Sequence, residues 1–198
     1  MTAAMEDEPQ HRSEDILYRN LLDWMGLAGH TDESTATRYV RALRQMTRGV
    51  HVDPGRHLQV QFPPVTTSLL LITVKDIPYV SLCAHHMLPF WGTTTIAVLP
   101  TPGAKIVGLS KITRCFQELA ARPQIQEQLG QQMLDAIQGN LDVSGAAIAI
   151  RGTHTCMALR GAATGTNTEM VTTSNMGKLE HEPWLGQFLT IARSVLTD

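Results

Sequence analysis

Apolar side chains recur every three or four residues in the first quarter of the chain, which is the spacing of one face of an α-helix. Ser13 offers an N-cap followed directly by two acidic residues, and it predicts a helix over residues 13–28. A second helix with the same spacing is predicted over residues 34–48. Residues 1–12 are polar and acidic, which is typical of a disordered tail. We therefore expect a helical N-terminal region, residues 13–50, after this tail.

Runs of β-branched and aliphatic residues replace the helical spacing beyond residue 64, and they alternate with further helical segments. The expected strands cover residues 66–77, 90–99, 146–151, 153–159 and 169–174, and the expected helices cover residues 110–121, 124–138 and 182–196. This order predicts an α+β domain over residues 51–198, in which an antiparallel sheet carries its helices on one face.

The composition limits the classes of protein to which the chain can belong. Its 198 residues can bury a sizeable core, and 43% apolar with 17% charged residues is typical of a globular domain. A net charge of −2 argues against bulk attraction to nucleic acid or to an anionic membrane, so an anionic substrate would need a local basic cluster.

No apolar run approaches the roughly 20 residues that cross a membrane, and the polar N-terminus lacks the apolar stretch of a signal peptide. A cytoplasmic location is therefore expected.

Two short clusters of cysteine and histidine carry the candidate chemistry. Cys83 and His86 are three residues apart, so one tight turn can direct a thiolate and an imidazole to a single point. His154 and Cys156 are two residues apart, so on a strand they would project from the same face. With Cys83, His86 and Cys156 as ligands, a zinc ion would keep its fourth position for water, which is typical of a catalytic site. The sequence thus predicts a zinc hydrolase, with His85 and His154 beside that water as proton carriers.

Each of these residues also has a commoner structural role. A single cysteine is more often a small buried apolar residue than a ligand, and Cys115, in the middle of a predicted helix, is interpreted in this way. His85 could be a structural neighbour of the site. The combined spacing of Cys83, His86 and Cys156 is what favours metal binding over these simpler interpretations.

The segment from Cys83 to Phe90 resembles the cysteine–glutamate–histidine–histidine motif of the GTP cyclohydrolase I family. Residues 106–114 and 122–127 are similar to the two central helices of that family, and residues 154–161 are similar to its second metal motif. The resemblance implies the tunnelling fold, in which small antiparallel sheets backed by helices join into an oligomeric barrel. It also implies a homo-oligomer, typically a decamer of two pentamers, with active sites at subunit junctions.

The resemblance further implies hydrolytic opening of the guanine imidazole ring of GTP at C8. Formate would be released, and rearrangement would give 7,8-dihydroneopterin triphosphate, a step of pterin and tetrahydrofolate synthesis. The metal would be zinc, although iron also suits these ligands. His154 would be the principal acid and base, with His85 as its assistant. In the substrate site, Glu127 would bind the guanine edge, Gln126 and Ser110 would line the pocket, and the triphosphate would be held by Lys111, Arg114, Arg160 and Arg38.

Several positions depart from the family pattern. Ala84 stands where the family has a glutamate, and residues 162–169 lack the basic residue usual after the arginine–glycine pair. Residues 151–153 replace a typically acidic and apolar stretch, and Ala36 replaces a proline.

These departures leave other functions open. One is a divergent paralogue that stops at a ring-opened formamide or diaminopyrimidine, or that uses another purine nucleotide. A non-catalytic nucleotide-binding regulator is less favoured. A structural zinc protein would need a fourth protein ligand, and a nitrile reductase of the same fold would need a further nucleophilic cysteine.

Overall fold

The computed structural model describes residues 8–32 and 34–193, which form two compact units divided between Met46 and Thr47. Residues 1–7 of the expected N-terminal tail and residues 194–198, at the end of the last expected helix, lie outside the described residues. No helix in the described part of the chain combines the length and the apolar character that a bilayer crossing requires.

The first unit consists of helices α1 (Glu8–Trp24) and α2 (Thr35–Met46), with a short 3₁₀ turn, η1 (Ala28–His30), between them. The rings of Tyr18 in α1 and Tyr39 in α2 stack with their centroids 4.4 Å apart. Helix α1 begins five residues before the predicted start at Ser13, so the expected tail is partly helical. Pro9 lies in the first turn of α1, where the missing backbone N–H of proline costs no hydrogen bond, so the helix can start this early.

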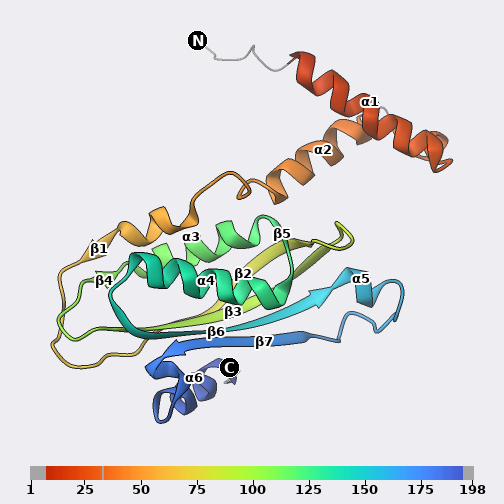
Figure 1. Ribbon diagram of the computed structural model, residues 1–198. Coiled ribbons are helices and arrows are strands. Elements are labelled where there is room, and N and C mark those ends of the chain that lie inside the picture. Colours follow the sequence, from red (N-terminus) through yellow and green to blue (C-terminus); the bar gives the residue numbers. More distant parts are fainter. Residues whose placement is uncertain (1–7, 33, 194–198) are drawn as a thin grey trace. The chain divides into compact units, whose positions relative to one another are not determined.

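The second unit is built on a five-stranded sheet with the order β5-β2-β3-β6-β7 (Figure 1). The four long strands pair antiparallel, and the short β5 pairs parallel with the end of β2. The strands are β2 (Ile72–Cys83), β3 (Pro89–Pro100), β5 (Pro123–Gln124), β6 (Val143–His154) and β7 (Met170–Gly177). A separate ribbon pairs β1 (Gln61–Phe62) with β4 (Ile106–Val107). The predicted α+β class is confirmed.

Helices α3 (Leu109–Ala120) and α4 (Gln126–Asn140) cover one face of this sheet, and the 3₁₀ segment η2 (Pro54–Gln59) packs beside them. The core on this face contains Ile96 and Ile148 from the sheet and Phe116 from α3, all fully buried.

The C-terminal helix α6 (Trp184–Arg193) follows the short η3 (Lys178–Glu180) and packs on the opposite face. Its Phe188 contacts a cluster that includes Ala97 and Ala147, whose side chains alternate with those of the main core. The prediction of helices on one face only is therefore incomplete. Both faces of β3 are covered at its C-terminal end, where every residue from position 94 to 100 is buried.

The strand predicted over residues 66–77 begins only at Ile72 and continues to Cys83, and a second local difference from prediction lies between residues 143 and 159. Two separate strands were expected there, but the structure has one twelve-residue strand, β6, that ends at His154. A single helical turn, α5 (Thr155–Ala158), follows directly. The prediction of strand for residues 153–159 is therefore wrong beyond His154, since alternation over so few residues cannot be distinguished from one helical turn.

Candidate metal centre and active site

Cys83, His86 and Cys156 lie together at one end of the sheet. In sequence, Cys156 is separated from the other two by β3, β6 and the elements between them. Their ligand atoms all lie within 4.8 Å of one another. The Cys83 Sγ atom lies 3.6 Å from His86 Nδ1 and 3.9 Å from Cys156 Sγ. A tetrahedral zinc ion with bonds of about 2.3 Å to sulfur and 2.0–2.1 Å to nitrogen would separate these atoms by about 3.6 and 3.8 Å. The donor types and these two separations therefore suit a zinc ion.

A tight turn after β2 positions the first two of these residues. The Cys83 N–H donates to the carbonyl of Leu88 at 2.8 Å, and the Cys83 carbonyl accepts from Met87 N–H at 2.8 Å. Met87 has a φ of 53°, in the left-handed region that a non-glycine residue adopts only when its surroundings require it. The Ala84 N–H donates to the carbonyl of Gln124 in β5 at 2.9 Å, so the turn is also held from outside.

Cys156 reaches the same point from the helical turn α5, not from a strand as predicted. The hydroxyl of Thr155 donates to the carbonyl of Pro89 at 2.6 Å, which fixes α5 to the start of β3. Burial raises the pKa of the Cys156 thiol, and the neighbouring Cys83 raises it further. Two thiolates so close together repel each other, and a bound cation would relieve that repulsion.

His154, the predicted acid and base, is the last residue of β6. Its ring stacks on Phe90 with the centroids 4.2 Å apart, because these two residues are paired in the β3–β6 register. Its Nε2 atom lies 2.9 Å from Gln126 Oε1. Burial lowers the pKa of His154, and the carboxylate of Glu127 opposes this shift. The ring is thus held on one face and on one edge.

The remaining residues predicted at this end of the sheet differ in exposure. His85 is exposed and lies beside His86, with their ring centroids 6.3 Å apart. Gln126 is buried in the first turn of α4, and the exposed Glu127 follows it. Arg160 is exposed just after α5, and its charge acts on the thiol of Cys156. The structure therefore brings these four residues to the candidate metal centre.

Ser110, Lys111 and Arg114 do not lie there. They occupy the first turns of α3, which follows β4 at the opposite end of the sheet from β5 and α5 (Figure 1). Only the C-terminal end of α3 approaches the metal turn, and at 1.5 Å per residue it lies about 13 Å from Lys111. Within one chain, these three side chains are thus remote from the candidate metal centre.

Arg38 lies on α2, in the first unit. Its guanidinium pairs with the carboxylate of Asp32 at 2.7 Å and also donates to the hydroxyl of Ser34. Hydrogen bonds from Arg38 and Ser34 hold the pKa of Asp32 well below its usual range. This pair is exposed, so it contributes little to stability.

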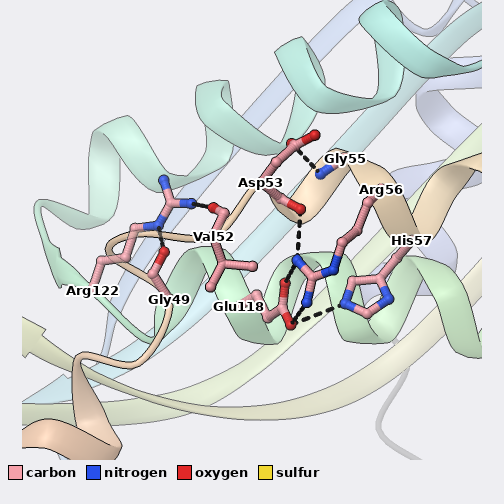
Figure 2. A network of polar contacts seen from close by, with 8 residues as sticks. All are labelled: Gly49, Val52, Asp53, Gly55, Arg56, His57, Glu118 and Arg122. Atoms are coloured by element: carbon pink, nitrogen blue, oxygen red, sulfur yellow. Dashed lines mark hydrogen bonds and ion pairs between the residues drawn. The ribbon is translucent and has the colours of Figure 1, made fainter.

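A network of polar contacts that the sequence did not suggest fixes η2 to α3 (Figure 2). Arg56 donates two hydrogen bonds of 2.6 Å to the carboxylate of Glu118, and His57 Nε2 lies 3.0 Å from the same carboxylate. The guanidinium of Arg122 donates to the carbonyls of Gly49 at 2.8 Å and Val52 at 2.7 Å. These contacts join segments about 60 to 70 residues apart, so no local motif could have indicated them.

Cys115 lies in α3 and does not belong to the metal cluster, as its interpretation as a core residue requires. It is fully buried, and burial raises the pKa of its thiol to about 12. A thiol with so high a pKa stays protonated and is a poor nucleophile.

Comparisons with known proteins bear on this arrangement. A family model described as GTP cyclohydrolase I matches residues 16–191. The GTP cyclohydrolase 1 of Rhodopirellula baltica is 42% identical over 127 residues, which are 64% of this chain and 54% of that protein. That of Corynebacterium glutamicum strain R is 40% identical over 64% of each chain. That of Bacillus cytotoxicus is 36% identical over 75% of this chain and 76% of its own length.

The matched part of the chain thus spans between about half and two thirds of the first two relatives. Among solved structures, the apo form of the archaeosine synthase QueF-like matches with a TM-score of 0.39 and 12% identity, covering 54% of this chain and 93% of that one. This likeness is too low to support an argument.

Proposed function

Because the chain belongs to the GTP cyclohydrolase I family, we propose that it is a zinc-dependent GTP cyclohydrolase I. It would open the guanine imidazole ring of GTP at C8, release formate and form 7,8-dihydroneopterin triphosphate. The observation that carries this proposal is the cluster of Cys83, His86 and Cys156, at distances that suit a zinc ion, with His154 held nearby.

Cys83, His86 and Cys156 would hold the metal. When bound, zinc supplies a Lewis acid that lowers the pKa of water, so that hydroxide is available near neutral pH. His154 would give a proton to the ring nitrogen that leaves C8, and His85 would assist from the exposed turn. The fixed orientation of His154 against Phe90 supports this division, because a proton carrier works best at a constant position.

Glu127 would bind the guanine edge, since one carboxylate can accept hydrogen bonds from two neighbouring N–H groups. Its exposure in the first turn of α4, beside the Gln126–His154 contact, supports this role. The triphosphate would be held by Lys111, Arg114, Arg160 and Arg38, with Ser110 nearby. A local set of cations is what a chain with a net charge of −2 needs to bind such an anion.

We also propose that copies of the chain assemble, as a decamer of two pentamers, through the barrel of the tunnelling fold. The position of Lys111 and Arg114 supports assembly, because they lie at the far end of α3 from the metal cluster of their own chain. They would reach the substrate only at a site to which a second copy contributes. The outer strand β7 has a free edge among the described residues, as a sheet that joins another would need.

Ala84 favours a second candidate, a divergent paralogue that opens the ring but stops at a formamide or diaminopyrimidine, or that uses another purine nucleotide. Ala84 is exposed in the metal turn, where the family has a carboxylate. A carboxylate there could take part in proton transfer after ring opening, and alanine cannot.

One experiment separates these functions. Zinc-loaded protein is incubated with GTP, and formate, the ring-opened formamide and the fluorescent pterin are quantified separately. Equal yields of formate and pterin support the full reaction, and accumulation of the formamide supports the paralogue. GTP binding without turnover would refute both and leave the regulator. Cys156→Ser should abolish turnover, while Cys115→Ala, which changes a cysteine outside the cluster, should retain it.

A further inference from the structure

The side-chain amide of Gln126 is held by four groups inside the protein, and the residue is only 1% exposed. Its Nε2 group donates to the carbonyls of Met170 at 3.0 Å and Ile150 at 3.3 Å, and to the hydroxyl of Thr172 at 3.3 Å. Its Oε1 atom lies 2.9 Å from Nε2 of His154. The amide thus connects α4, β6 and β7 to the ring of the predicted proton carrier.

These partners fix which end of the amide faces which neighbour. Backbone carbonyls can only accept hydrogen bonds, so the NH₂ end must face Ile150 and Met170. The oxygen end must then face His154, and an amide oxygen can only accept. His154 Nε2 must therefore carry a hydrogen, and in the neutral ring the free lone pair is on Nδ1. Turning the ring over would place a carbon against the Gln126 oxygen and lose this hydrogen bond.

Gly152 makes room for this contact. A Cβ atom at position 152 would lie 2.4 Å from Gln126 Oε1 and 2.8 Å from the hydroxyl of Tyr79. Both distances are far shorter than van der Waals contact, so a larger residue would displace the amide oxygen that His154 meets. The backbone of Gly152 is paired within the sheet, with Gly92 of β3 on one side and Met170 of β7 on the other, so it cannot easily move away.

We propose that Gln126 is a positioning residue, which fixes His154 in the tautomer with its proton on Nε2, and that Gly152 admits it to this position. Gln126 would thus act through His154 and not, as the family resemblance implies, by lining the substrate pocket. The expected effect on turnover rests on the proposed function. The expected tautomer of His154 rests only on the hydrogen bonds described above.

The tautomer can be measured directly. Zinc-loaded protein labelled with ¹⁵N-histidine is studied by magic-angle-spinning NMR at neutral pH, and the His154 signals are assigned by their loss in His154→Ala. We expect a protonated Nε2 and an unprotonated Nδ1. Gln126→Met and Gly152→Ala should each yield a detectable population of the other tautomer, while Gln128→Met, an exposed control on the same helix, should not. A wild-type protein with the proton on Nδ1 would overturn the proposal.

Kinetics with GTP provide a second, independent readout. A misoriented proton carrier should lower kcat at least about tenfold, which is part of the 10²–10⁴-fold that general acid–base catalysis contributes, and leave KM within about twofold. An unchanged kcat with a raised KM in Gln126→Met would instead identify a pocket residue and overturn the proposal. If the wild type does not turn over GTP, the proposed function fails, and the NMR result still decides the tautomer.

Discussion

Glu118 offers a direct test of how the segment before the sheet is held on α3. Its carboxylate accepts two hydrogen bonds of 2.6 Å from Arg56 and lies 3.0 Å from His57 Nε2 (Figure 2). Glu118→Gln keeps the shape of the side chain but removes its charge and replaces one acceptor by a donor. We expect this substitution to lower the free energy of unfolding by about 1.5 kcal/mol near pH 7.

The exposure of the two partners sets this magnitude. Hydrogen bonds to charged groups contribute about 1.5–3 kcal/mol when shielded from water, and fully exposed ion pairs contribute about 0.2–1 kcal/mol. The side chain of Glu118 is 20% exposed and that of Arg56 is 44% exposed. The pair lies between these limits, and its two-point geometry places it near the lower end of the shielded range.

The effect should depend on pH in a defined direction. Burial alone would raise the pKa of Glu118, but hydrogen bonds from Arg56 and His57 outweigh it and lower the pKa below its usual value. A lowered folded-state pKa adds stability that is fully present above the unfolded value of about 4.3 and is lost as the pH falls through the folded value. The difference between wild type and Glu118→Gln should therefore be fully present at about pH 5 and above and shrink below about pH 4.

Urea unfolding of the zinc-saturated proteins, at one fixed protein concentration and several pH values, measures this difference. Glu180→Gln changes an exposed carboxylate in η3 and serves as the control, with an expected effect below about 0.5 kcal/mol. A Glu118→Gln effect no larger than that of the control near pH 7 would refute the reasoning. So would an effect that persists undiminished near pH 3.

Three further predictions concern the core, the metal and the assembly. Phe116→Ala, at a fully buried ring, should cost about 3–5 kcal/mol in urea unfolding, and a cost below about 1 kcal/mol would contradict the core described above. Cys156→Ser should lose most of the bound zinc in metal analysis, whereas Cys115→Ala should keep it; equal zinc in both would exclude Cys156 as a ligand. Arg114→Ala and Cys156→Ser should each be inactive with GTP but regain part of the activity when unfolded and refolded together, because one copy would supply the arginine and another the metal site. No recovery in correctly assembled mixtures would contradict a shared site.

The sequence was most informative where a few neighbouring residues determine the geometry. Cys83 and His86 share one turn, so their spacing was enough to predict that they point to the same place. The same reasoning failed for residues 153–159, where the chain leaves the strand at His154 and Cys156 lies in a helical turn. Cys156 still approaches Cys83, because Thr155 fixes the turn to Pro89 on the neighbouring strand.

Contacts between distant segments could not be predicted in this way. The stacking of Phe90 on His154 depends on the β3–β6 register, and the contact of Gln126 with His154 depends on how α4 lies across the sheet. A continuous apolar run in β3 did carry a signal that both of its faces are covered, but this signal does not identify α6 as the covering helix. The sequence pattern also cannot show that Lys111 lies at the end of α3 that is far from its own metal cluster. This position depends on the direction in which the helix crosses the sheet.

The short segment 123–127 serves three different purposes within five residues. The carbonyl of Gln124 supports the metal turn, the amide of Gln126 holds His154, and Glu127 carries the carboxylate proposed to bind the base. An insertion or deletion of one residue between Gln124 and Glu127 would change the spacing of these three groups, so the length of the segment is constrained as well as the side chains of Gln126 and Glu127. Variation in substrate preference among related chains would then arise elsewhere, and the exposed stretch over residues 161–169, which follows α5 and its Cys156, is the candidate segment for it.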